Sequence, residues 1–243
     1  MSEEIRLLDA EQTAAFDEEY ISKEMFVQVT ETLDRHLNTP EVSRYLDVGG
    51  GNGLYADKLL SRYPNSSVTV VEPEPSLLQK NRPHENKVLR EGIFQDVDDL
   101  SDLDLIQFNW VLHHFVSSDY ASTCNLQLNS LKQAHQMLAP GGLVIIFENF
   151  YEGMECSDKP GERIYHLTAS KLLKPFTSRL GANTAGVGVA FHSELYWREQ
   201  LMKAGFDQMF STHCYDFGNL SPIKRKLLRI KEQRVGMLVG IKS

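Results

Sequence analysis

The chain carries the segment Leu46-Asp47-Val48-Gly49-Gly50-Gly51-Asn52-Gly53, in which a short apolar run stops in a cluster of glycines. Such a run is typical of a buried strand that enters a tight turn. The residues that follow, 54–63, place apolar side chains at helical spacing. Glycine allows the backbone conformations of such a turn and, having no Cβ atom, lets a ligand approach the main chain closely. The segment therefore predicts a strand, a ligand-binding turn and a helix.

Strand and helix patterns alternate along the rest of the chain. Strands are predicted at residues 45–48, 68–71, 87–90, 105–111, 143–147, 209–215 and 234–241, and helices near residues 54–63, 76–80, 123–138, 163–174 and 193–205. Repeated alternation favours a parallel sheet with helices on both faces. We expect an α/β fold with a Rossmann-like, doubly wound, mostly parallel seven-stranded sheet, whose ligands bind at the C-terminal ends of the strands.

Three segments fall outside this alternation. Residues 1–40 have helical periodicity and predict an N-terminal helical cap before a main domain of residues 41–243. Residues 151–192 lose periodicity and gather glycines, which favours an inserted lid or substrate cap; the alternative is a plain connecting loop. The basic run at residues 224–231 is better explained as a solvated helix face than as an anion site.

Composition limits the classes of partner. With 243 residues, 42% of them hydrophobic, the chain can bury one core, which excludes a disordered or fibrous protein. A formal net charge of −8 disfavours non-specific electrostatic binding to phosphate backbones, so we expect no nucleic-acid partner. Cys124, Cys156 and Cys214 form no CxxC pair, and no basic, apolar leader opens the sequence. We therefore expect a cytoplasmic protein without a membrane partner, either a monomer or a homodimer.

The glycine turn and the acid after it indicate a nucleoside ligand. A dinucleotide fingerprint that began at Gly49 would need glycine at position 54, where Leu54 stands, so a nicotinamide oxidoreductase is disfavoured. Glu72 ends the second predicted strand, where a carboxylate accepts hydrogen bonds from two ribose hydroxyls. Together with Asp47, these residues favour a nucleoside that lacks a diphosphate.

At this point the chain resembles the class I S-adenosylmethionine-dependent methyltransferases, well over residues 44–150 and loosely over residues 193–243. The resemblance implies S-adenosyl-L-methionine as cofactor and S-adenosyl-L-homocysteine as product. It implies that the glycine turn surrounds the methionine part, that Glu72 holds the ribose and that Phe94 flanks the adenine. The cofactor-binding residues implied are Asp47, Gly49, Gly51, Gly53, Glu72, Pro73, Phe94 and Asn109.

Two histidines end the fourth predicted strand, in Trp110-Val111-Leu112-His113-His114, and Glu148 ends the fifth. A hydroxyl that accepts a methyl group must lose a proton, and histidine has a suitable pKa. A carboxylate hydrogen-bonded to the imidazole fixes its tautomer. The arrangement is similar to that of the plant-type small-molecule O-methyltransferases, which implies that His113 is the general base and Glu148 its partner. His114 is a less favoured base, and packing at the strand end is the non-catalytic alternative.

We therefore expect a methyltransferase that acts on a small, partly apolar acceptor, with oxygen as the favoured atom. The alternatives are a nitrogen acceptor, an activated carbon such as the enol position of a 2-oxo acid, or a non-catalytic cofactor-binding module that serves a protein partner. The Asn/Asp-Pro-Pro-Tyr motif of nucleic-acid amino-methylating enzymes is absent, and no metal-ligand spacing is found. Further candidates for lining the pocket are Tyr20, Tyr151, Tyr165, His166 and His192. Taken singly, each of them is better explained as a packed or surface side chain.

Overall fold

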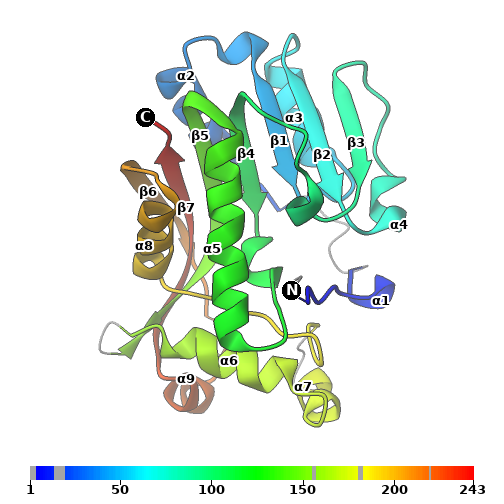
Figure 1. Cartoon of the computed structure of the whole chain (residues 1–243). Helices are drawn as coiled ribbons and strands as arrows, with labels where there is room; N and C mark the ends of the chain where they lie inside the picture. The colour runs from blue at the N-terminus through cyan, green and yellow to red at the C-terminus, as the bar shows by residue number, and fades with distance from the viewer. Residues whose placement is uncertain (1–3, 14–19, 155–156, 180–182, 219) are drawn as a thin grey trace.

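The computed structural model describes residues 4–13, 20–154, 157–179, 183–218 and 220–243. Its centre is a seven-stranded sheet with the order β3-β2-β1-β4-β5-β7-β6 (Figure 1). The strands are β1 (Arg44–Val48), β2 (Ser67–Glu72), β3 (Lys87–Glu91), β4 (Leu103–Asn109), β5 (Leu138–Gly153), β6 (Gln208–Asp216) and β7 (Ile230–Ile241). Strands β1 to β5 pair in parallel, whereas β7 runs antiparallel to both β5 and β6. The predicted α/β, doubly wound, mostly parallel sheet is confirmed.

Helices cover both faces of this sheet. They are α1 (Ala10–Thr13), α2 (Lys23–His36), α3 (Leu54–Arg62), α4 (Pro75–Leu78), α5 (Tyr120–Met137), α6 (Lys159–Ala169), α7 (Lys174–Arg179), α8 (Glu194–Ala204) and α9 (Pro222–Leu228), with the short 3-10 helices η2 (Pro40–Val42), η3 (Phe94–Asp96) and η4 (Leu112–His114). Because side chains of a strand alternate between faces, Leu46 packs in the core with α5 and α8, while Tyr45 packs with α2 and α3. In the ranges described above, none of the helices has the length and apolarity to span a membrane.

Several element boundaries differ from the predicted ones. The strand predicted at 143–147 is the much longer β5, because β7 pairs with it as far as Gly153. The helix predicted at 163–174 is replaced by α6 and α7, separated by an irregular turn. The strand predicted to reach Val111 ends at Asn109, because Trp110 has a positive φ of 51°. The helical pattern through residues 14–16, parts of the predicted lid (155–156 and 180–182) and Cys156 lie outside the described residues.

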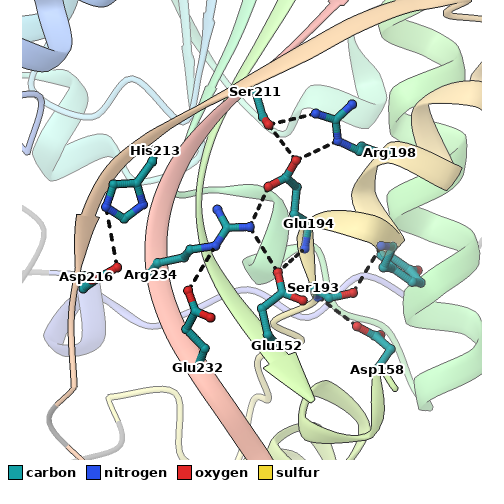
Figure 2. A network of polar contacts seen from close by, with 11 residues as sticks. Glu152, Asp158, Ser193, Glu194, Arg198, Ser211, His213, Asp216, Glu232 and Arg234 are labelled. Atoms are coloured by element: carbon teal, nitrogen blue, oxygen red, sulfur yellow. Dashed lines mark hydrogen bonds and ion pairs between the residues drawn. The ribbon is translucent and has the colours of Figure 1, made fainter. Parts of the chain in front are cut away.

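A polar network ties α8 to the antiparallel edge of the sheet (Figure 2). Glu194 accepts hydrogen bonds from Ser211 (2.6 Å), Arg198 (2.7 Å) and Arg234 (2.5 Å), and Arg234 also reaches Glu152 at 3.3 Å. Burial alone would raise the pKa of Glu194, but these three donors outweigh it and lower the pKa to about 2. The network therefore stabilises the ionised form of Glu194.

Candidate functional site

A cavity of about 450 Å³ opens where β1, β2 and β4 end. Its volume lies within the roughly 300–1,000 Å³ of small-molecule sites. Of the predicted cofactor residues, those that line it are Asp47, Gly49, Gly51, Glu72, Pro73, Phe94 and Asn109. Gly53 is outside the lining and is the N-cap of α3, where an added Cβ would lie 1.7 Å from Asn81 Oδ1. The sheet thus brings seven of the eight predicted residues together, and Gly53 serves the packing of α3.

The glycines of the turn after β1 have different roles. Gly49 and Gly51 have positive φ values of 66° and 52°. A Cβ at Gly49 would lie 2.7 Å from Val111 Cγ2, so the chain's own packing requires glycine there. A Cβ at Gly51 would meet Leu77 at 4.0 Å and nothing nearer. Gly51 therefore presents an open stretch of backbone to the cavity.

The carboxylate of Glu72 is buried beside this turn and held by main-chain groups. Its Oε2 accepts the N–H of Gly51 at 3.0 Å, and its Oε1 accepts the N–H of Glu74 at 2.9 Å. Burial raises the pKa of Glu72, and these two hydrogen bonds oppose the rise. Because each carboxylate oxygen can accept a second hydrogen bond, the side chain is oriented and still able to bind two hydroxyls.

A hydrogen-bonded chain orients Asn109 at the end of β4. The Tyr55 hydroxyl donates to Gln107 Oε1 at 2.8 Å, and Gln107 Nε2 donates to Asn109 Oδ1 at 2.7 Å. Next to it, Trp110 stacks on Phe147 with ring centroids 5.7 Å apart. The positive φ of Trp110 is uncommon for a bulky residue, and such backbone strain is typical of functional sites.

His113 and Glu148 meet as predicted from the adjacency of β4 and β5, in which Asn109 pairs with Phe147. His113 Nδ1 lies 2.7 Å from Glu148 Oε2, and the His113 backbone N–H donates to Oε1 at 3.2 Å. Both residues are buried, with 5% and 1% of their surface exposed, and His113 lines the cavity. The carboxylate fixes the proton on Nδ1, so Nε2 is the basic nitrogen.

His114 also lines the cavity, but its surroundings disfavour a positive charge. Burial, followed by the proximity of His113, lowers the pKa of His114 well below its usual value of 6.5. Its ring centroid is 4.1 Å from that of His113. His113, in turn, has a carboxylate placed to stabilise the imidazolium that proton transfer would create.

Part of the cavity wall comes from residues outside the predicted cofactor and catalytic residues. Leu8 and Tyr20 of the N-terminal segment line it, as do Asn149 and Tyr215. Tyr20 is among the pocket candidates from the sequence, whereas nothing in the pattern of β6 indicates Tyr215. None of the described residues of 151–192, the predicted lid, lines this cavity. Within the part of the chain that the structure describes, no group of three or more His, Cys, Asp or Glu side chains is arranged to hold a metal ion.

A family profile and a curated relative both match methyltransferases. The profile of the methyltransferase domain family matches residues 19–209. The ribosomal RNA small subunit methyltransferase C of Pseudomonas putida (strain W619) is 31% identical over 155 residues, which are 57% of this chain and 46% of that protein. The chain therefore spans about half the length of that curated relative.

Solved structures match over most of this chain at low identity. Phosphoethanolamine N-methyltransferase 2 of Haemonchus contortus, in complex with phosphomonomethylethanolamine and S-adenosylhomocysteine, is 14% identical with a TM-score of 0.61, and the match covers 95% of this chain and 57% of that one. Human N-acetylserotonin methyltransferase, in complex with SAM, is 17% identical with a TM-score of 0.51, over 90% and 54%. These likenesses show a shared fold.

Proposed function

Because the chain belongs to the methyltransferase domain family, we propose that it is a class I S-adenosylmethionine-dependent methyltransferase that methylates an oxygen atom of a small, partly apolar acceptor. The observation that carries this proposal is the buried His113–Glu148 pair. His113 lines the same cavity as Glu72 and Gly51. In this proposal, a base and a nucleoside-binding carboxylate share that cavity.

The residues present fit the cofactor. Gly51 offers open backbone, and Glu72 offers a buried carboxylate that main-chain N–H groups already orient. We assign Glu72 to the ribose hydroxyls, Asp47 and the turn at Gly51 to the methionine part, and Phe94 to the adenine. When bound, S-adenosylmethionine supplies an electrophilic methyl group on a sulfonium sulfur.

His113 performs the proton transfer in this proposal. Its Nε2 removes the proton of the acceptor hydroxyl as the new carbon–oxygen bond forms and the sulfur–carbon bond breaks. Glu148, at 2.7 Å from Nδ1, stabilises the resulting imidazolium. Because both side chains are almost completely buried, water competes little for the acceptor, and alignment of the nucleophile supplies most of the rate.

The ribosomal RNA methyltransferase relative, at 31% identity, favours RNA as a second candidate acceptor. Against it stand the net charge of −8 and the sequence Asn109-Trp110-Val111, which lacks the Asn/Asp-Pro-Pro-Tyr motif. A nitrogen or carbon atom of a small molecule is a third candidate acceptor, and a non-catalytic cofactor-binding module is the candidate without transfer chemistry. We give the small-molecule hydroxyl precedence and include RNA in the test.

The test has two stages. Calorimetry with S-adenosylmethionine and S-adenosylhomocysteine measures binding, and absence of binding at millimolar ligand would refute the assignment of the cavity. Formation of S-adenosylhomocysteine is then followed with a protein-free metabolite extract and, separately, with purified ribosomal RNA. Turnover with the extract supports the proposal, turnover with RNA alone replaces it, and turnover with neither favours the non-catalytic module.

A further inference from the structure

His192 is a fully buried histidine outside the cavity lining, and both of its ring nitrogens are engaged. Its Nδ1 lies 2.5 Å from Asp158 Oδ2, and its Nε2 lies 2.9 Å from Gln127 Oε1. The ring stacks on Tyr196 with centroids 3.7 Å apart and an interplanar angle of 7°. Packing and hydrogen bonds therefore hold the ring in one orientation.

The orientation of the Gln127 amide determines the proton on Nε2. Gln127 Nε2 donates to the backbone oxygen of Leu112 at 3.1 Å and approaches that of Ala190 at 3.5 Å. Since a carbonyl oxygen only accepts, the amide nitrogen must face these two atoms and the amide oxygen must face His192. His192 Nε2 is consequently a donor and carries a proton.

Asp158 determines the proton on Nδ1. Its Oδ1 accepts the backbone N–H of Ser193 at 2.9 Å, a contact drawn in Figure 2, and its Oδ2 accepts from the Tyr120 hydroxyl at 3.3 Å. Both carboxylate oxygens of Asp158 therefore already act as acceptors. The nitrogen that faces it at 2.5 Å must then donate. With a donor position on each ring nitrogen, the contacts have the geometry of an imidazolium paired with the Asp158 carboxylate.

Titratable side chains other than Asp158 also lie near the ring. Tyr120 of α5 and Tyr196 of α8 pack against it, and Cys124 of α5 interacts with both tyrosines. Burial raises the pKa of all three, so they are neutral near pH 7. Beyond the ring, Glu162 of α6 acts electrostatically on Cys124. Asp158 is accordingly the anion that balances His192.

This ion pair is connected to the turn that carries His113. Gln127 holds the carbonyl of Leu112, the residue that precedes His113. The N–H of Ala190, two residues before His192, donates to the His113 carbonyl at 3.0 Å. Between them, the Phe191 ring lies 4.6 Å from the His113 ring. Ala190 and Phe191 therefore contact His113 at its backbone and at its ring face, and His192 reaches the same turn through Gln127.

We propose that His192 is a positioning residue, which as an imidazolium paired with Asp158 holds Gln127 and thereby the 112–113 turn in the orientation that aims His113 at the acceptor. The inference rests on the proposed function, because it assigns His192 a part in placing the base of that reaction. A buried pair of this kind is costly unless every group is satisfied, and here each ring nitrogen and each carboxylate oxygen has a partner.

The experiment is ¹⁵N NMR of histidine-labelled protein at pH 7. Signals are assigned with variants in which one histidine at a time is replaced. In the unmodified chain we expect both ring nitrogens of His192 to be protonated. Gln127→Glu keeps an oxygen for His192 but removes the donors to Leu112 and Ala190. We expect His192 to stay doubly protonated and the His113 signals to shift. Turnover should fall about tenfold or more, with S-adenosylmethionine affinity within about twofold of normal.

His166→Gln is the matched control, because the His166 side chain is 64% exposed on α6 and should change neither signal nor turnover. If Gln127→Glu does not fold, Gln127→Met replaces it. One unprotonated ring nitrogen on His192 would overturn the proposal, and so would His113 signals that are unchanged by the Gln127 substitution. Shifted signals in a chain that transfers no methyl group would refute the proposed function and leave the coupling between His192 and His113 established.

Discussion

Replacement of Glu72 by glutamine is the most direct test of the cofactor site. Glu72→Gln keeps the length of the side chain and one acceptor oxygen but removes the charge and the second acceptor. In the native structure both carboxylate oxygens accept a main-chain N–H, from Gly51 at 3.0 Å and from Glu74 at 2.9 Å. The amide nitrogen of the variant must therefore face one of these donors. At that position no oxygen remains to accept a hydrogen bond from a ribose hydroxyl.

The size of the effect follows from these contacts. A hydrogen bond to a charged group contributes about 1.5–3 kcal/mol. Loss of one such bond, with weakening of the other, amounts to about 2–3 kcal/mol. Since about 1.4 kcal/mol is a tenfold change in affinity, the dissociation constant of S-adenosylmethionine should rise roughly 30- to 150-fold. The substitution leaves His113 and Glu148 untouched, so the loss should be one of binding.

Protein stability should respond differently from binding. Burial raises the folded-state pKa of Glu72. The contribution of this group to protein stability is therefore complete below its unfolded-state pKa of 4.5 and is lost as the pH rises through its folded-state pKa. At pH 7 the ionised carboxylate therefore costs stability, which Glu72→Gln relieves. The amide that faces a main-chain donor opposes this gain, and the net change in unfolding free energy should stay within about 1 kcal/mol.

Isothermal calorimetry at pH 7 measures the affinity, and Glu74→Gln is the control. Glu74 is on the same cavity wall, and its Oε1 accepts the N–H of Ser76 to cap α4. Its replacement removes the same charge two residues away and keeps the capping oxygen. We expect the control to bind within about threefold of the native chain. Equal affinities for the two variants would refute the assignment of Glu72 to the ribose.

Three further predictions concern other parts of the site and fold. His113→Ala should lower turnover roughly 10²-fold or more with cofactor affinity nearly unchanged; unchanged S-adenosylhomocysteine production would remove His113 from the mechanism. Gly50→Ala would place a Cβ 2.5 Å from Asp47 Oδ2 and should lower the melting temperature. Gly51→Ala has room for the Cβ but a positive φ of 52°, so it should lower the melting temperature by backbone strain and also weaken cofactor binding in calorimetry. Glu194→Gln should lower the free energy of unfolding in urea at pH 7 by less than about 3 kcal/mol, because solvent screens part of this interaction. The stabilisation is present above pH 4.5 and lost as pH falls toward 2, so a difference that persists at pH 2 would contradict this account.

The parts of the fold that could be predicted are those with local signals. The turn at residues 49–53 marks its own strand and helix, and Glu72 marks the end of the next strand. Adjacency of the fourth and fifth strands follows from the order of such sheets, so a contact between His113 and Glu148 could be predicted across 35 positions. Each of these signals lies within a few residues of the feature that it marks.

The parts that could not be predicted depend on partners far along the chain. The apolar run of β5 is interrupted by Glu148 and Asn149, so its pattern ends at Phe147, although the strand continues to Gly153. What extends it is β7, whose residues 230–236 pair with the polar half. A strand whose side chains are partly polar is stabilised by its neighbour's main chain, and its own sequence shows no apolar alternation from which that could be inferred.

Residues proposed for methyl transfer have local sequence signals, whereas residues that could select the acceptor do not. Glu72 ends β2, and Gly51 and His113 follow the ends of β1 and β4 within a few residues, so their places in the site can be inferred from sequence order. Tyr20 and Tyr215 reach the cavity from segments almost two hundred positions apart. No local pattern relates these two, because only tertiary packing places them in one wall. The acceptor's identity therefore has to come from experiment on the folded chain, beginning with the cavity that these tyrosines help to enclose.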